Sequence, residues 1–292
     1  MRTGFIGILN NPSVSPNSHS AGWNELVRCS IDEEAKILTE KDDWNQYDRL
    51  IINHGPNFKP GSYNVIGGIS QAVIKRTSKL LDFIGEVYTF DGFQVMDFIE
   101  KRNLLQLGFV LNDWEIENIS LPKKDKLVIG DSHAISVWPG PTHSIERLDG
   151  KTLWGFMKDP KPADIYYFGN IDARFHWGRQ PNPHRAVHEL VNRYIDFVDL
   201  NGGTITCLLP VESEVRKLPG TGLYKGQPYF GSIELRRELV SIFNNEILSS
   251  NLQYISWPVE WYMSPSYFET EVMEPRQSVH IRPKHYYATR KR

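Results

Sequence analysis

A serine followed by a histidine ends an apolar segment in the second half of the chain. The segment, Leu127-Val-Ile-Gly-Asp-Ser-His-Ala134, predicts a strand that stops at Gly130 and a turn that carries Asp131, Ser132 and His133. A serine at the carboxyl edge of a parallel sheet lies where open α/β sheets bind ligands, and the N–H groups of a following helix favour an oxyanion. Ser132 therefore has the place of a nucleophile, provided that another residue supplies a base. The alternative is that Asp131 and Ser132 only cap a helix, as those residue types commonly do.

A second polar cluster follows the next strand, which we expect at Asp164 to Phe168. In Gly169-Asn-Ile-Asp-Ala-Arg-Phe-His176 the side chains of Asp172, Arg174 and His176 alternate with period 2, so an extended segment would turn all three the same way. We expect them at the ligand-binding edge of the sheet. The alternatives are a solvated face or a structural pair of Asp172 with Arg174.

Two further histidines have a spacing that metal sites use. His184 and His188 lie four residues apart on a predicted helix, with Glu189 beside the second. A zinc site needs a third ligand and an open position, and no residue is spaced to complete one. We therefore interpret these two as ordinary helical histidines, and we expect neither a metal nor another cofactor.

The order of these blocks resembles the SGNH (GDSL-like) hydrolase and acyltransferase superfamily over about residues 124–285. Gly130-Asp-Ser-His-Ala134 is similar to the form found in SGNH domains attached to acyltransferases. The resemblance implies that Ser132 is the nucleophile and that His280, 148 residues later in Arg276-Gln-Ser-Val-His-Ile281, is the general base. It also implies Gly140 as an oxyanion-hole N–H donor, a place for which Gly150 and Gly155 compete. We interpret His133 as a supporting or packing residue.

Two positions depart from the pattern of that superfamily. The aspartate that usually precedes the base by three residues is replaced by Gln277, so a backbone carbonyl, Gln277 or Glu274 would orient His280. The third block usually reads Gly-x-Asn-Asp, but here Ile171 occupies the asparagine position and Asn170 comes one residue earlier. The segment is similar to a Gly-Glu-Ile-Asp-x-Arg-x-His variant of that block. The oxyanion donor is then Asn170, with Arg174 or His176 as alternatives.

The elements that position these residues alternate between short apolar runs and amphipathic segments. The predicted strands are Phe5 to Leu9, Leu50 to Asn53, Glu86 to Phe90, Lys126 to Ile129, Asp164 to Phe168, Thr204 to Leu209 and Tyr254 to Trp257. Helical periodicity predicts helices at Ile69 to Ile84, Ala186 to Val198 and Ser232 to Ser250. We therefore predict an α/β protein of two Rossmann/flavodoxin-like three-layer units with mainly parallel sheets. The polar stretch before Lys126 separates an N-terminal domain, 1–120, from an SGNH-like domain, 121–292.

Composition excludes several classes of protein. The 292 residues carry 33 Lys plus Arg against 35 Asp plus Glu, so no whole-chain basic charge favours nucleic acid or anionic lipid. No run of 18 apolar residues predicts a membrane span, and no signal peptide is visible. Because Cys29 and Cys207 are the only cysteines, we expect no disulfide framework and a cytoplasmic location.

The first domain has a separate resemblance. Trp44-Asn-Gln-Tyr-Asp-Arg-Leu-Ile-Ile-Asn53, with Asn57-Phe58, Gly61, Asn64 and Ile69-Ser70, resembles the N-terminal domain of bacteriophage DNA β-glucosyltransferases. This resemblance implies a phage origin, the host cytoplasm as location, and modified DNA or a sugar nucleotide as a partner of the first domain. Three functions stay open: an SGNH-type serine esterase or O-acyltransferase, with a small-molecule or carbohydrate ester as substrate; a phage glycosyl- or group-transferase that modifies DNA bases; and a catalytically degenerate binding domain. In the transferase, Asp131, Asp172 or Arg174 would bind the donor.

Overall fold

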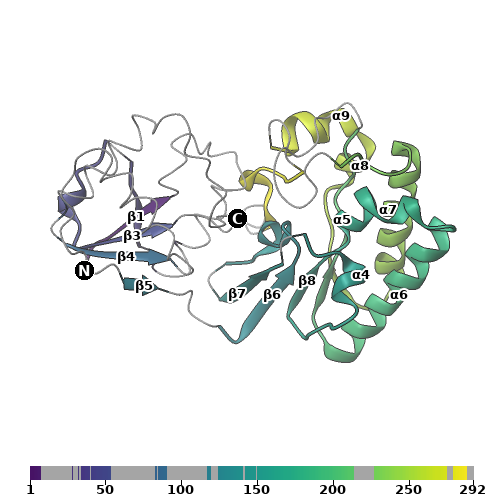
Figure 1. The fold of residues 1–292 in the computed structure, drawn as a ribbon, viewed down its shortest axis with the longest axis horizontal. Helices are drawn as coiled ribbons and strands as arrows, with labels where there is room; N and C mark the ends of the chain where they lie inside the picture. Colours follow the sequence, from purple (N-terminus) through teal and green to yellow (C-terminus); the bar gives the residue numbers. More distant parts are fainter. Residues whose placement is uncertain are drawn as a thin grey trace. The chain divides into compact units, whose positions relative to one another are not determined.

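The computed structural model describes two compact units, which meet in the sequence between Lys123 and Lys124 (Figure 1). The described residues are 1–7, 28, 32, 34–39, 41–53, 83, 85–90, 117–119, 124–140, 142–148, 150–213, 227–274 and 279–287. Most of the predicted helix at 69–84, the residues after 53 that resemble the glucosyltransferases, Cys29 and Gln277 lie outside them.

The first unit is built on a parallel five-stranded sheet in the order β2-β1-β3-β4-β5. The strands are β1 (Thr3–Gly7), β2 (Lys36–Ile37), β3 (Arg49–Asn53), β4 (Glu86–Phe90) and β5 (Glu117–Ile119). Phe5, Leu50 and Ile51 are fully buried on β1 and β3, as the apolar runs predict. The short 3-10 helix η1 (Trp44–Gln46) precedes β3 and buries Trp44.

The second unit repeats the same strand order in a second parallel sheet, β10-β9-β8-β6-β7. Its strands are β6 (Lys126–Gly130), β7 (His143–Arg147), β8 (Ile165–Tyr167), β9 (Thr204–Thr206) and β10 (Gln253–Ile255). Strand β7 was not predicted, because its residues are all half-buried and form no apolar run. The register pairs Gly130 with Tyr167, so β6 and β8 end beside each other.

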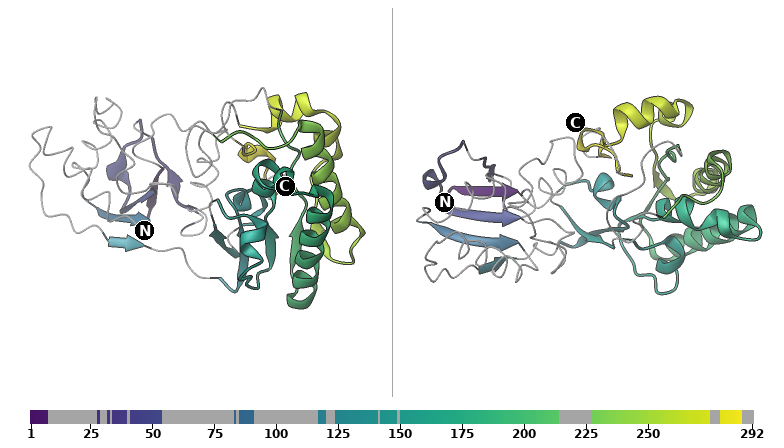
Figure 2. Two further views of the ribbon diagram at one scale, coloured as in Figure 1. Left: turned by 45° about the vertical axis from the view of Figure 1, so that its right-hand side comes forward. Right: turned by 45° about the horizontal axis from the view of Figure 1, so that its top comes forward.

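Helices join and cover the strands of the second unit. They are η2 (Ala134–Val137), α4 (Leu153–Phe156), α5 (Asn170–Phe175), η3 (Trp177–Arg179), α6 (Pro183–Asn201), α7 (Ile233–Ser249), α8 (Val259–Met263), α9 (Pro265–Tyr267), the π-helical turn η4 (Phe268–Val272) and η5 (Pro283–His285). The long helices α6 and α7 lie side by side (Figure 1, Figure 2). Asn182 and Ser232 cap their first turns by accepting backbone N–H groups, so both helices start close to the predicted positions.

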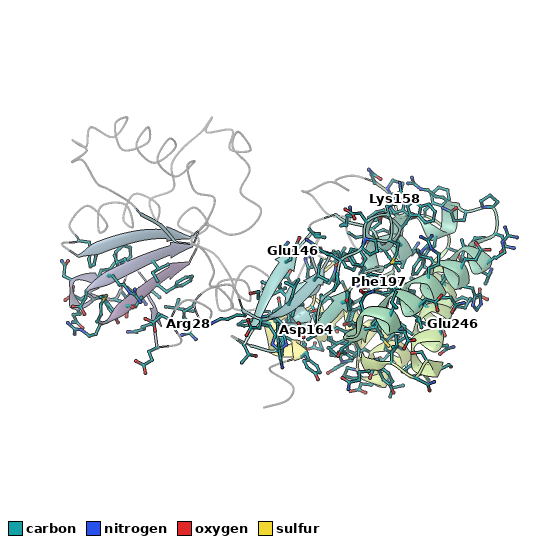
Figure 3. All side chains as sticks on the ribbon, turned by 90° about the horizontal axis from the view of Figure 1, so that it is seen from below. Arg28, Glu146, Lys158, Asp164, Phe197 and Glu246 are labelled. Carbon is teal, nitrogen blue, oxygen red and sulfur yellow. The ribbon has the colours of Figure 1, made fainter. Side chains whose placement is uncertain are left out.

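Aromatic side chains fill the space between α6 and the sheet. Phe156 stacks on Phe168 at 4.3 Å between ring centroids. Phe197 of α6, labelled in Figure 3, places its ring edge-on to both Phe156 and Tyr166 at about 6 Å between ring centroids.

A side chain also joins the amino-terminal ends of β6 and β8. The carboxylate of Asp164, which precedes β8, accepts a hydrogen bond from Leu127 N–H of β6 at 2.7 Å and so aligns the two strands (Figure 3).

The predicted mixed α/β class with parallel sheets is confirmed. All strand pairings within the two sheets are parallel, and the described residues add one isolated antiparallel bridge, between Met273 and Ile281. Among the described helices, none combines the length and the apolar character that crossing a membrane requires.

Candidate active site

The candidate site lies where the strand order of the second sheet reverses. From β6 the chain continues to β7 on one side, and the next strand, β8, pairs on the other side of β6. The connections that leave β6 and β8 therefore diverge at the carboxyl edge, which is the position at which open α/β sheets bind ligands. Ser132 follows the end of β6 by two residues, and Asn170 follows the end of β8 by three.

Gly130 allows the two strand ends to approach closely. A Cβ atom at this position would lie 2.4 Å from the backbone oxygen of Tyr167 and 3.0 Å from the Cβ of Ala134. The next residue, Asp131, donates its N–H to the same Tyr167 oxygen at 3.1 Å. The element that follows Ser132 is the 3-10 helix η2, which has four residues. A helix therefore follows Ser132, but it is of the 3-10 type, because the turn closes by hydrogen bonds three residues apart, such as Ala134 N–H to Asp131 O.

Ser132 and His280 are in hydrogen-bonding contact although 148 residues separate them. His280 Nε2 lies 2.9 Å from Ser132 Oγ, within the range of a nucleophile and its base. Both side chains are half-buried. The histidine is held by antiparallel pairing, because Glu274 N–H donates to His280 O and Arg282 N–H donates to Val272 O. With Nε2 unprotonated, the imidazole accepts the serine hydroxyl proton in this geometry.

The carboxylate of Asp131 pairs with His133. Its Oδ1 accepts the backbone N–H of His133 at 2.8 Å and lies 3.0 Å from the Nδ1 of the same residue. The other ring nitrogen, Nε2, lies 3.0 Å from the carbonyl oxygen of Val279, the residue before His280. Both Asp131 and His133 are buried, and the rings of His133 and His280 lie 4.7 Å apart.

Asn170 has a side-chain amide that is buried and free of partners. It opens α5 after Gly169, whose φ of +112° lets the chain turn sharply out of β8. Among the described residues, neither Oδ1 nor Nδ2 of Asn170 has a hydrogen-bond partner. Burial raises the pKa of Tyr167 well above its usual value, and the nearby Asn170 amide acts in the opposite direction although the two groups do not reach hydrogen-bond geometry. Buried polar atoms without partners are rare in proteins, and here they lie at the ligand edge of the sheet.

The predicted common direction of Asp172, Arg174 and His176 is wrong. The segment is the helix α5, in which side chains two residues apart are related by a rotation of about 200° about the helix axis and so point to nearly opposite sides. Gly169 O accepts the N–H of Ala173, and this bond closes the first helical turn directly after the strand. The period-2 pattern of polar residues therefore has no structural counterpart.

Asp172 supports α4 and does not contact Ser132. Its carboxylate accepts the N–H of Leu153 at 2.6 Å and that of Trp154 at 3.4 Å, and so occupies the N-terminus of α4. Burial raises the pKa of Asp172 to about 6, although the two backbone hydrogen bonds act in the opposite direction. The described contacts of the Asp172 carboxylate are therefore those of a residue that anchors α4.

Arg174 belongs to a buried charge cluster that the sequence analysis missed. Its Nε donates to Glu212 Oε1 at 2.8 Å and to Oε2 at 3.1 Å, and its NH1 donates to Asn170 O. Tyr229 donates its hydroxyl to the same carboxylate, and Arg236 donates to Glu212 O. Burial would lower the pKa of Arg174, but the Glu212 carboxylate outweighs it and raises the pKa. One signal was available, since Glu212 follows the predicted strand Thr204 to Leu209 at its carboxyl end.

Gly140 and His176 have no contact with Ser132 in the described part of the chain. Gly140 has a φ of +131°, and its carbonyl accepts the N–H of His143 at the start of β7. His176 ends α5, where burial and the neighbouring Arg179 lower its pKa. Of the competing glycines, Gly155 donates its N–H to the capping hydroxyl of Thr152 in α4.

The contacts of His184 and His188 and the burial of Cys207 indicate structural roles. His184 pairs with Glu238 and His188 with Glu246, so both histidines link α6 to α7. No group of three potential metal ligands occurs among the described residues. Cys207 is buried, and burial raises the pKa of its thiol to about 12.

Neither the family models, nor the curated proteins, nor the solved structures with which the chain was compared include a match. Functional inference therefore depends on the geometry at the carboxyl edge of the second sheet. There, the residues that the structure brings together are Ser132, His280, His133 and Asp131.

Proposed function

We propose that the second unit is a serine-dependent esterase or O-acyltransferase of the SGNH type. The observation that carries the proposal is the 2.9 Å contact between His280 Nε2 and Ser132 Oγ at the switch point of a parallel sheet. A chance pairing of two polar residues would not favour this edge of the sheet. If the strands of the second unit, β6 to β10, are numbered from 1 to 5, their order in the sheet is 2-1-3-4-5. This order also agrees with a flavodoxin-like, three-layer SGNH domain.

In the proposed reaction, Ser132 Oγ attacks the carbonyl carbon of an acyl ester while His280 Nε2 takes the hydroxyl proton. The tetrahedral intermediate collapses, the ester C–O bond breaks, and His280 returns the proton to the departing alcohol. Water then hydrolyses the acyl-serine in an esterase, whereas an acceptor hydroxyl takes the acyl group in a transferase. In both cases His280 removes the proton from the incoming hydroxyl and returns it to Ser132.

The negative oxygen of the intermediate needs hydrogen-bond donors that are in place before the reaction. The Nδ2 of Asn170 is our first candidate donor, because it is buried after β8 and no described residue forms a hydrogen bond with it. The Ser132 N–H is the second, since a nucleophilic serine can supply its own backbone N–H to the oxyanion. Gly140 remains a candidate that no described contact supports.

The substrate class is proposed from the SGNH resemblance: an acyl ester, with a carbohydrate as the alcohol part. The transferase that modifies DNA bases and the degenerate binding domain remain alternatives, and neither is favoured by a described contact. In the transferase, Ser132 would be incidental and His280 would have no reason to contact its hydroxyl.

Labelling with an activated fluorophosphonate tests the proposal, with the adduct located by mass spectrometry. We expect one adduct at Ser132 in the intact protein, none in Ser132→Ala, and a loss of about 10³-fold or more in labelling rate in His280→Ala. Ser250→Ala and His184→Ala, which change residues outside the site, serve as matched controls and should label at the normal rate. Folded protein that forms no adduct would refute the proposal, and thermal shifts with sugar nucleotides and DNA would then test the transferase.

A further inference from the structure

His133 lies between the carboxylate that precedes the nucleophile and the segment that carries the base. We propose that His133, oriented by Asp131, is the positioning residue of this site and holds His280 against Ser132 by binding the carbonyl of Val279. The inference rests on the proposed function, because it assigns His133 a role only if His280 acts as a base. His133 itself is a positioning residue, since its ring nitrogens contact Asp131 and Val279 and not the reacting atoms.

The hydrogen-bonding capacity of the groups supports this assignment. A backbone carbonyl only accepts, so the 3.0 Å contact with Val279 O requires a proton on His133 Nε2. The 3.0 Å contact between Nδ1 and Asp131 Oδ1 requires a second proton, carried by either the ring or the carboxyl group. With both nitrogens engaged, the ring cannot rotate without losing two buried hydrogen bonds.

The location of the pair accounts for a departure from the family pattern. In the usual arrangement an aspartate three residues before the base orients it, and Gln277 stands there in this chain. Here the residue adjacent to the base is held instead: His133 binds Val279 O from the side of β6, while Glu274 N–H holds His280 O from the paired segment. These two contacts hold consecutive carbonyls, so together they restrict the backbone that carries His280.

The surroundings of His133 leave little room for an alternative role. Its ring faces His280 at 4.7 Å and Tyr167 edge-on at 6.1 Å, and only 2% of the residue is exposed. A residue so buried contacts no substrate directly. It affects the reaction by fixing the separation of Ser132 and His280, to which proton transfer is sensitive.

Two substitutions separate the contacts of His133. The amide nitrogen of asparagine occupies roughly the place of Nδ1, so His133→Asn keeps the Asp131 contact and loses the Val279 contact. The longer His133→Gln places its amide near Nε2, so it keeps a donor for Val279 O and loses the Asp131 side-chain contact. For each variant, the fluorophosphonate labelling rate is separated into the maximal rate, kinact, and the reagent affinity, KI, with thermal melting as the check on folding.

We expect His133→Asn to lower kinact by about 10²-fold, because a base displaced by about 1 Å costs that much. Its KI should change less than about threefold, since reagent binding does not need the base. His133→Gln should restore kinact to within about fivefold of the unaltered protein. His184→Asn, at a histidine of α6 outside the site, should change neither value.

The outcomes separate the inference from the function on which it rests. An unaltered protein that is not labelled refutes the proposed function, and the inference with it. If the unaltered protein is labelled and His133→Asn matches it, or if both His133 variants are equally slow, the function stands and the positioning role is wrong. Should His133→Asn fail to fold, histidine ¹⁵N NMR of the unaltered protein tests the inference instead. The His133 resonance is identified by its absence from the spectrum of His133→Gln. A protonated Nε2 is the expected result, and an unprotonated Nε2 overturns the inference.

Discussion

Glu212 is expected to be essential to the stability of the second unit. Its carboxylate is fully buried and receives Arg174 Nε at 2.8 Å and the Tyr229 hydroxyl, and Arg236 is buried against its backbone. In Glu212→Gln the volume is kept and the charge is lost, so buried guanidinium groups lose their counter-charge. At an effective dielectric constant of about 20, unit charges roughly 3 to 4 Å apart attract by about 4 to 6 kcal/mol. We therefore expect a loss of about 3 to 5 kcal/mol, the usual cost of breaking a buried ion pair.

Urea unfolding followed by tryptophan fluorescence measures this loss. With a slope near 2 kcal/mol per M, a loss of about 4 kcal/mol lowers the midpoint by about 2 M. Arg174→Met in the Glu212→Gln background removes one uncompensated charge, so the double variant should be more stable than the sum of the single effects by about 2 kcal/mol or more. A Glu212→Gln cost below about 1 kcal/mol, or strictly additive effects, would contradict the reasoning.

Three further substitutions test the site and its support. Asn170→Ala should slow labelling of Ser132 by about 10²-fold or more, because an oxyanion donor is lost. The melting temperature should stay equal or rise, because no described residue forms a hydrogen bond with the amide. A large drop in melting temperature would show a structural role instead. Gly130→Ala places a Cβ 2.4 Å from Tyr167 O, so it should cost about 1 to 3 kcal/mol in urea unfolding and slow labelling as well; an unchanged protein would contradict the close approach of β6 to β8. Because burial raises the pKa of Asp172 from 3.8 to about 6, the folded state holds this proton more tightly than the unfolded state. Protonated Asp172 therefore contributes up to about 3 kcal/mol to the free energy of unfolding below pH 4, and this contribution is lost as the pH rises through about 6. Urea midpoints measured between pH 4 and 8 should fall accordingly in the unaltered protein, and this part of the pH dependence should be absent in Asp172→Asn.

Local patterns in the sequence were sufficient for the two long helices and the central strands. The helical stripe Val187, Leu190, Val191, Tyr194 and Val198 is the buried face of α6, and Ser232 caps α7 as its residue type indicates. The apolar run Leu127 to Ile129 forms most of β6. These features depend on side-chain period and on capping, which involve residues within a few positions of one another.

Where a local pattern had two explanations, the sequence alone led to the wrong one. The alternation of Asp172, Arg174 and His176 predicted an extended segment, whereas Gly169 turns the chain and a helix forms. The polarity of α5 is then explained by distant partners: α4 for Asp172, and Glu212 for Arg174. The edge strand β7 had no apolar run because a strand with one neighbour is less buried than a central strand.

The sequence by itself determined the α/β class, the central strands and the polar turn that carries Ser132, because each depends on neighbouring residues. Only the tertiary structure decided the partners of that turn. His280 reaches Ser132 across 148 residues, and Val279 reaches His133 across 146. No pattern within a short stretch encodes such contacts, because they arise when parallel strands bring their carboxyl ends to one edge and a returning C-terminal segment lies across it.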